Sequence, residues 1–192
     1  MNRLFLQLSC CLLAVAACSS AAPAGLSVPG TVQVGPLAET FDSPVPHGSA
    51  PAGVIESFRE AWVLWDQSSE DQRLAAPVTD YVTGKALTSN LDAVISTEKR
   101  QDLVPSGADR FFKTTVTAHS ASAATVSTCD DGSKFHVVFK RTGKIDQAYQ
   151  ATSPSQQYLF EIFTMIRQKG HWAISAVSIV QSPDHRADQC QP

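Results

Sequence analysis

The region 111–180 constrains the fold most strongly, because its apolar residues recur at every second position. In one run, Phe135, Val137 and Phe139 are separated by His136 and Val138. Alternation rich in Val, Ile, Thr and Phe predicts strands with one buried face. Short turn-forming segments divide the alternating runs; they are 120–122, 130–133 and 169–170. Such loops join antiparallel neighbours, so the sequence predicts a meander of about five strands.

Helical spacing precedes this region. The first predicted helix starts at Val54 and carries one apolar stripe, formed by Ile55, Phe58, Trp62 and Trp65. Arg59 and the neighbouring glutamates are expected to face away from that stripe. The helix is expected to stop at 66–69 and to be followed by a short second helix to Ala76 and a third over 84–98.

Helices followed by an antiparallel sheet predict an α+β domain with the helices on one face. A long meander has a natural twist, so the sheet should curl around the N-terminal helices packed on its concave face. The result is a cone-like roll with an open end, where small molecules often bind. We expect this domain to cover 54–182 and a polar C-terminal tail to cover 183–192.

The start of the chain predicts export and lipidation. A short basic segment precedes the apolar run 4–17, which is shorter than the roughly 20 residues of a membrane-spanning helix. Small residues then precede Cys18, a pattern that resembles the lipobox of bacterial lipoproteins. We expect 1–18 to be a lipoprotein signal peptide with its lipobox, and Cys18 to carry a lipid such as palmitate that anchors the protein outside the cytoplasm on the cell membrane. An ordinary secretory signal, with Cys18 incidental, is the alternative.

The segment 19–53 has the composition of a linker. It consists mostly of Pro, Ala, Ser and Gly, which bury too little apolar surface to offset the cost of ordering. The sequence therefore predicts a flexible tether. Within it, 31–34 is the segment that can pair with the edge of a sheet.

Charge and cysteine content limit the partners and predict one cross-link. A net charge of −3 without any Lys/Arg cluster argues against a nucleic-acid partner. Cys129 and Cys190 are the thiols of the expected folded part, and such a pair in an exported protein predicts a disulfide, with two free thiols as the alternative. No cofactor or metal site is predicted, because the hairpin turn explains the adjacent Asp130 and Asp131, and calcium needs at least about six oxygens.

Several short segments carry a resemblance in their order and spacing. Besides Cys18 they are 81–87, 124–131, 142–143 and 170–174. Together they resemble the nuclear-transport-factor-2-like (cystatin-like α+β roll) superfamily, and more narrowly the uncharacterised actinobacterial cell-envelope lipoproteins that carry this roll. The resemblance implies the cone and a location in the envelope. It implies no single activity, because the superfamily hosts isomerases, dehydratases and inactive scaffolds.

Enzymes of this superfamily place an Asp, His or Tyr inside the cone. The candidates here are Asp80, Tyr81, Asp92, His119 and His136. None has the local setting of an enzyme signature, so solvated or capping roles are preferred and no catalytic residue is assigned. Candidate pocket-lining residues, which also suit a filled core, are Phe58, Trp62, Phe112, His136, Phe163 and Trp172.

Three functions remain open at this stage. The first is a membrane-tethered binding or scaffold module without catalytic activity, with an envelope protein as its partner. The second is a carrier for a small apolar ligand or lipid in the cone. The third is an isomerase- or dehydratase-like enzyme, which rests on analogy of fold. A filled cone with an exposed apolar patch favours the scaffold, and an open apolar cavity without a buried carboxylate or histidine favours the carrier. A buried Asp or His facing an open cavity favours the enzyme.

Overall fold

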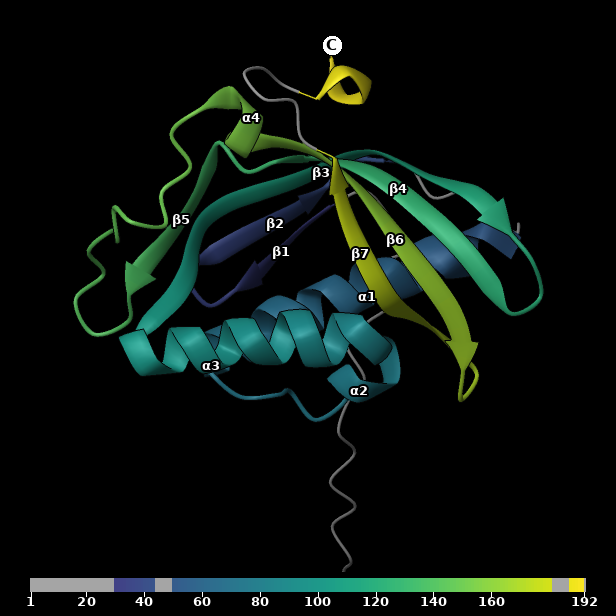
Figure 1. The fold of residues 1–192 in the computed structure, drawn as a ribbon, viewed down its shortest axis with the longest axis horizontal. Helices are drawn as coiled ribbons and strands as arrows, with labels where there is room; N and C mark the ends of the chain where they lie inside the picture. Colours follow the sequence, from purple (N-terminus) through teal and green to yellow (C-terminus); the bar gives the residue numbers. More distant parts are fainter. Residues whose placement is uncertain (1–29, 44–49, 181–186, 192) are drawn as a thin grey trace, which may run out of the picture.

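The computed structural model describes residues 30–43, 50–180 and 187–191, so the predicted signal peptide and Cys18 lie outside the described residues. The fold is α+β, with a curved seven-stranded sheet and helices on its concave face (Figure 1). This confirms the predicted fold class. Within the described part, no helix is both long and apolar enough to cross a membrane.

The elements follow one another in a simple order. The strands are β1 (Gly30–Val34), β2 (Leu37–Phe41), β3 (Leu103–His119), β4 (Ala123–Asp131), β5 (Lys134–Phe139), β6 (Tyr158–Gln168) and β7 (His171–Val180). The helices are α1 (Ala50–Asp71), α2 (Val78–Tyr81), the π-helical η1 (Ala86–Leu91), α3 (Asp92–Gln101), α4 (Pro154–Gln157) and the 3-10 turn η2 (Asp188–Cys190).

The sheet is mixed, which corrects the expected antiparallel meander. Its strand order is β1-β2-β3-β4-β6-β7, and β5 pairs with the first part of β3, next to the end of β4. Strand β2 runs parallel to β3, with Leu37 opposite Gly107 and Phe41 opposite Phe111. The long strand β3 therefore pairs with three neighbouring strands. The expected meander contained only local pairings, which is why it missed both the parallel pair and the branch.

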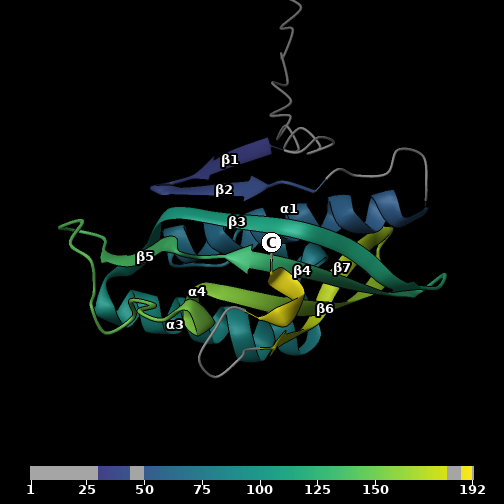
Figure 2. The ribbon, with the colours of Figure 1, turned by 90° about the horizontal axis from the view of Figure 1, so that it is seen from above.

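The hairpin β1–β2 lies inside the segment predicted to be a flexible tether, so the tether prediction is wrong for 30–41. The expected pairing of 31–34 at a sheet edge is confirmed, because β1 is the edge strand. In β2, Leu37, Glu39 and Phe41 are buried and the residues between them are less so. The hairpin continues the sheet beyond β3, next to α1 (Figure 2). Strand β2 was not predicted because an acidic residue occupies the middle one of its inward-facing positions.

The same region buries a second face of α1. Arg59, expected to face solvent, is 1% exposed. Its guanidinium donates a hydrogen bond to the carbonyl of Ser43 and lies 5.6 Å from the ring centre of Phe41. Burial lowers the pKa of Arg59. Helix α1 is covered on two sides, whereas its apolar stripe predicts only one buried side. The expectation that Arg59 faces solvent was therefore wrong.

Helix α1 also continues through 66–69, where it was expected to stop. The hydroxyl of Ser68 donates to the carbonyl of Leu64 at 2.6 Å and accepts from the backbone N–H of Ala75 at 3.0 Å. Buried serines can satisfy their hydroxyls inside a helix in this way. The predicted second helix up to Ala76 is replaced by α2, and the predicted third helix corresponds to η1 and α3, which ends at Gln101.

Aromatic rings form the contact between α1 and the sheet. Phe58 packs against Phe163 with ring centres 4.8 Å apart and against Phe111 at 6.2 Å. Trp62 lies one helical turn later and contacts Phe111 at 5.2 Å and Phe163 at 5.5 Å. Offset and edge-to-face packing of this kind adds to the stabilisation from burial alone.

The structure joins Cys129 and Cys190 in a disulfide, with Cα atoms 5.5 Å apart. Both residues are buried together with Ala187, and Phe112 and Phe160 pack against them. The bond therefore fixes the C-terminal turn against β4 and β6. This is the pairing expected from the sequence.

Cys129→Ser should lower the free energy of unfolding by about 4 kcal/mol under non-reducing conditions, because the bridge closes a loop with a sequence separation of 61. Guanidinium denaturation with and without reductant measures the difference. Equal stability of the wild type in both conditions would show that the bridge does not constrain the chain.

Candidate ligand-binding cavity

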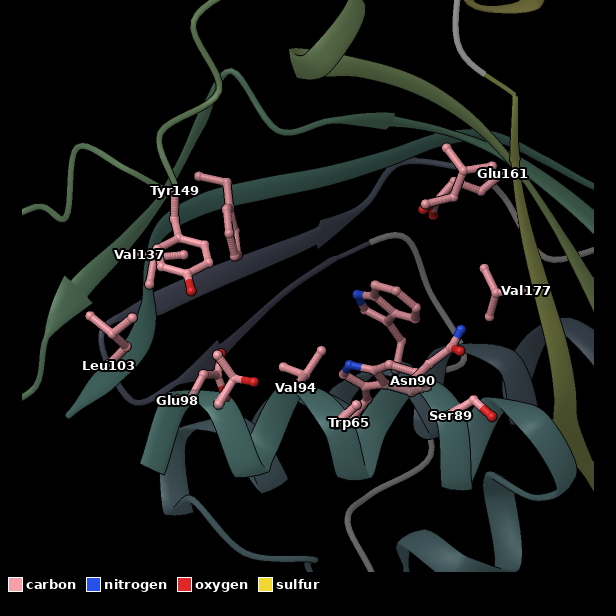
Figure 3. A pocket seen from close by; sticks show the side chains of 15 residues that line it. Trp65, Ser89, Asn90, Val94, Glu98, Leu103, Val137, Tyr149, Glu161 and Val177 are labelled. Carbon is pink, nitrogen blue, oxygen red and sulfur yellow. The ribbon is translucent and has the colours of Figure 1, made fainter. Parts of the chain in front are cut away.

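The cone is open and holds a cavity of about 600 Å³ between α3 and the concave face of the sheet (Figure 3). Helices α1, η1 and α3 form one side, and β3, β5, β6 and β7 form the other. The lining residues are Trp62, Trp65, Ser89, Asn90, Ala93, Val94, Thr97, Glu98, Leu103, Phe135, Val137, Tyr149, Glu161, Val177 and Ile179. The cavity is therefore built mostly from apolar and aromatic side chains.

Large apolar side chains remain exposed around this cavity. Val94 is 38% exposed, Tyr149 46% and Ile179 52%. Deeper in, the rings of Trp62 and Trp65 stack with their centres 5.5 Å apart. Aromatic walls and an apolar rim are typical of sites that enclose small molecules.

A second cavity of about 250 Å³ adjoins the first. The two share the lining residues Trp62, Trp65, Val94, Glu98 and Phe135. The smaller one adds three carboxyl groups, from Asp66, Asp109 and Asp130. The interior of the cone is thus apolar at its mouth and acidic at depth.

Glu161 is the acidic group that most directly faces the larger cavity. It shares the inward side of β6 with Phe163 and Met165 and is only 4% exposed. Figure 3 shows its carboxyl group pointing from the sheet into the cavity. Its Oε2 has no hydrogen-bond partner among the described residues. Burial, then the charges of Asp109 and Asp66, raises the pKa of Glu161 to about 8, so the isolated carboxyl is largely protonated at pH 7.

Glu39 and Asp66 form a buried carboxyl pair. Burial raises the pKa of Glu39 well above its usual range, and the charge and hydrogen bond of Asp66 raise it further. Burial raises the pKa of Asp66 to about 6, although its hydrogen bond with Glu39 opposes the shift. Two carboxyl groups can hydrogen-bond to each other only when one of them carries a proton. Both shifts favour the protonated form of the pair.

Asp109 and Asp130 form a second pair on the neighbouring strands β3 and β4. Burial is the largest cause of the raised pKa of both groups. For Asp130 the charge of Asp109 and a hydrogen bond with it add to the shift. Glu39 lies opposite Asp109 in the register of β2 and β3, so the two pairs are neighbours.

Glu98 on α3 lines both cavities. Burial raises its pKa to about 7, against the effect of a hydrogen bond with Ser69. Among the described residues that line the two cavities there is no Lys, Arg or His. Nor are any three Asp, Glu, His or Cys side chains in the described ranges placed to share a metal ion. No basic side chain among these lining residues therefore offsets the acidic groups of this interior.

The predicted pocket-lining residues are scattered over the domain. Trp62 lines the main cavity, whereas Phe58 and Phe163 lie in the core and Phe112 packs beside the disulfide. Trp172 lines a separate depression of about 420 Å³, together with His119. His136 shares a hydrogen bond of 2.9 Å with Gln150, and its neighbours in β5, not His136 itself, line the cavity.

The side chains weighed as catalytic candidates also lie elsewhere. Asp80 forms an exposed ion pair with Lys169 at 2.8 Å, and the hydrogen bond from Lys169 lowers the pKa of Asp80. Burial raises the pKa of Tyr81 to about 12, and its ring lies 5.0 Å from that of His171. Asp92 begins α3 and does not line the cavity.

None of the carboxyl groups inside the cone was predicted from the sequence to be a site residue, and Asp130 was assigned to a hairpin turn. A signal was present in the alternation itself, because Asp109 and Glu161 each lie two residues before a buried phenylalanine. Likewise, Asp66 follows Trp62 by one helical turn on α1. An acidic residue in phase with the inward apolar positions is the pattern that identifies this site.

Comparisons with known proteins add no assignment. No protein-family model and no curated protein sequence matches the chain. Solved structures that are similar to it in part include the following three. The intermembrane-space region of the chloroplast protein ARC6 has 13% identity and a TM-score of 0.41, over 71% of this chain and 100% of that one.

The other two come from bacteria. A proposed aromatic ring hydroxylase from Novosphingobium aromaticivorans has 8% identity and a TM-score of 0.43, over 70% of this chain and 96% of that one. A ketosteroid isomerase-like protein from Erwinia carotovora atroseptica has 15% identity and a TM-score of 0.40, over 71% and 99%. Likenesses of this size identify neither the family nor the activity of this chain.

The stability of the domain should fall as the pH rises from about 4.5 to about 8. The folded state holds the Glu161 proton more tightly than the unfolded state, so its contribution is fully present at low pH and is lost as pH rises through the folded pKa of about 8. Glu161→Gln should flatten this dependence by an amount on the order of several kcal/mol. Chemical denaturation at a series of pH values measures it.

Glu56→Gln, at an exposed glutamate of α1, is the control for removing a carboxyl group from the domain. A wild type whose stability is the same at pH 5 and pH 8, or a Glu161→Gln variant with an unchanged slope, would contradict the buried, protonated state of Glu161.

Proposed function

We propose that this protein is a lipid-anchored, extracytoplasmic binding protein whose cone carries a small, largely apolar ligand. One observation carries the proposal: an open cavity of about 600 Å³ with apolar walls. Its volume lies within the range of roughly 300–1,000 Å³ that suits a small organic molecule. Residues such as Val94 and Ile179 would leave water when the ligand binds, which favours association.

The anchor rests on the sequence alone. The basic start, the apolar run 4–17 and the small residues before Cys18 support a lipoprotein signal with lipid attached at Cys18. In this proposal the lipid holds the cone near the membrane surface, where apolar small molecules are concentrated. An envelope protein is the partner that would deliver or receive the ligand.

The cavity favours the carrier over the scaffold. A scaffold that acts through an exposed face has no need of an open interior, and a filled cone would have supported that hypothesis. The space beside Trp62 and Trp65 is instead accessible, and exposed apolar residues border it.

A second candidate, an isomerase- or dehydratase-like enzyme, is favoured by one observation. A buried acid that is protonated at neutral pH, as expected for Glu161, is suited to donate a proton to a bound molecule. A carrier returns its ligand unchanged, whereas an enzyme alters it. Mass spectrometry of the ligand recovered after incubation with the protein distinguishes the two.

Ala93→Phe should weaken binding in the cavity. Ala93 lines the cavity on α3 and is exposed, so a phenyl group there can fill the space without disturbing the core. The neutral probe 2-(1-naphthyl)ethanol should bind the wild type and bind Ala93→Phe at least about ten-fold more weakly, since several apolar contacts are lost. Isothermal titration calorimetry with protein in lipid nanodiscs, and empty nanodiscs as the blank, measures both.

Ser96→Phe is the matched control, because Ser96 is exposed on the same helix and does not line the cavity. Its affinity should stay within two-fold of the wild type. Absence of probe binding to the wild type, or equal weakening by both substitutions, would contradict the proposed site.

Cys18→Ala should remove the lipid anchor and so release the protein from the membrane. The domain should stay folded, because Cys18 precedes all the described elements. Metabolic labelling with a palmitate analogue should mark the wild type and not the variant. Labelling of both, or of neither, would show that Cys18 is not the lipidated residue.

A further inference from the structure

The interior of the cone contains more acid than its own residues neutralise. Six carboxyl groups converge there from six different elements; they are Glu39, Asp66, Glu98, Asp109, Asp130 and Glu161. The described residues that line the cavities include no basic side chain. Glu39 interacts with Asp66, and Asp109 with Asp130. Glu98 and Glu161 are the two of the six that line the larger cavity.

Unpartnered buried oxygens also occur at Glu39, Asp66, Asp130 and Glu98, but the first three do not line the larger cavity and Glu98 is only partly buried. Glu161 combines near-complete burial with a place on the wall of that cavity. It is almost fully buried, its Oε2 has no hydrogen-bond partner among the described residues, and its carboxyl group points into the larger cavity (Figure 3). An unpartnered buried carboxyl group is costly, and that cost is recovered when a ligand supplies a donor. The position of Glu161 therefore indicates which functional group of the ligand meets it.

We propose that the ligand of the cone is an organic cation, an amine with an apolar body whose ammonium group pairs with Glu161. This inference rests on the proposed function, since it names the class of molecule that the cavity carries. The apolar walls would enclose the body of such a ligand, and Glu161 would accept hydrogen bonds from its N–H groups.

Three features favour an amine over other ligands. A metal ion is disfavoured because no three liganding side chains in the described ranges are suitably placed. An anionic ligand would be repelled by the surrounding carboxyl groups. Trp62, Trp65 and Tyr149 line the same cavity, and aromatic rings attract ammonium groups in addition to enclosing the ligand.

Binding of an amine should displace the proton of Glu161. The groups that face Glu161 are acidic: Asp66 from α1, Glu98 from α3, Asp109 from β3 and Asp130 from β4, with Glu39 of β2 behind them. Strand β7 contributes only Val177 and Ile179, and η1 only Ser89 and Asn90. With a pKa of about 8 in the empty cone, Glu161 is mostly protonated at pH 7. A bound ammonium group stabilises the ionised form, so amine binding at pH 7 should release close to one proton.

The test compares three probes that share a naphthyl body. They are 2-(1-naphthyl)ethylamine, the neutral 2-(1-naphthyl)ethanol and the anionic 1-naphthaleneacetic acid. Calorimetry at pH 7 uses the full-length chain in lipid nanodiscs, with empty nanodiscs as the blank, in two buffers of different ionisation enthalpy. The amine should bind at least about ten-fold more tightly than the alcohol, the gain of a charged hydrogen-bonded pair. Only the amine should show a buffer-dependent heat that corresponds to proton release.

Glu161→Gln should reduce amine affinity to that of the alcohol for the same variant. Glu98→Gln, a second acid of the same cavity, is the matched control and should retain the preference for the amine. If Glu161→Gln does not fold, the release of a proton on amine binding to the wild type is by itself the test of this inference.

The outcomes separate the two proposals. If none of the probes binds, the cavity is not a binding site and the proposed function fails. If the alcohol binds as tightly as the amine, if the amine releases no proton, or if Glu98→Gln abolishes the preference while Glu161→Gln does not, the cone still binds small molecules but this inference is wrong.

Discussion

The packing of Trp62 determines where the solid core ends and the cavity begins. On one side its ring contacts Phe58, Phe111 and Phe163, which join α1 to the concave face of the sheet. On the other side it stacks on Trp65 and borders open space. Because the large rings close one end of the cone, the curved sheet can stay apart from α3 at the other end without collapsing onto it.

The separation of the solid core from the cavity explains why the interior of the cone tolerates acidic groups. The core itself is apolar, and the carboxyl groups lie beyond it, around the adjoining cavities. No basic side chain lies among the described lining residues, and burial together with mutual repulsion raises the pKa of Glu39, Asp130 and Glu161. Such an arrangement costs stability. Buried acidic groups that lower the stability of a protein are common in binding or catalytic sites, because a complementary molecule that enters can pair with them.

The sequence predicted what depends on local pattern and missed what depends on distant contacts. The alternation in 135–139 and 158–180 predicted strands correctly, because period-two burial is a local property. The hairpin 30–41 was missed because Glu39 interrupts its apolar alternation. Burial of Arg59 follows from that hairpin, so it could not be predicted from α1 alone. The acidic site was missed because acids such as Glu161 were not considered as site residues, and only the fold brings six of them together.

The central claim is that the cone holds a buried carboxyl group that is protonated at neutral pH and faces an open cavity. A pH titration of the side-chain carboxyl carbon of Glu161 by ¹³C NMR, assigned through Glu161→Gln, tests it most directly. The titration of Glu161 should have its midpoint at about pH 8. A midpoint near 4.5, the ordinary value for glutamate, would mean that water or an opposite charge reaches this carboxyl group, and would contradict the account.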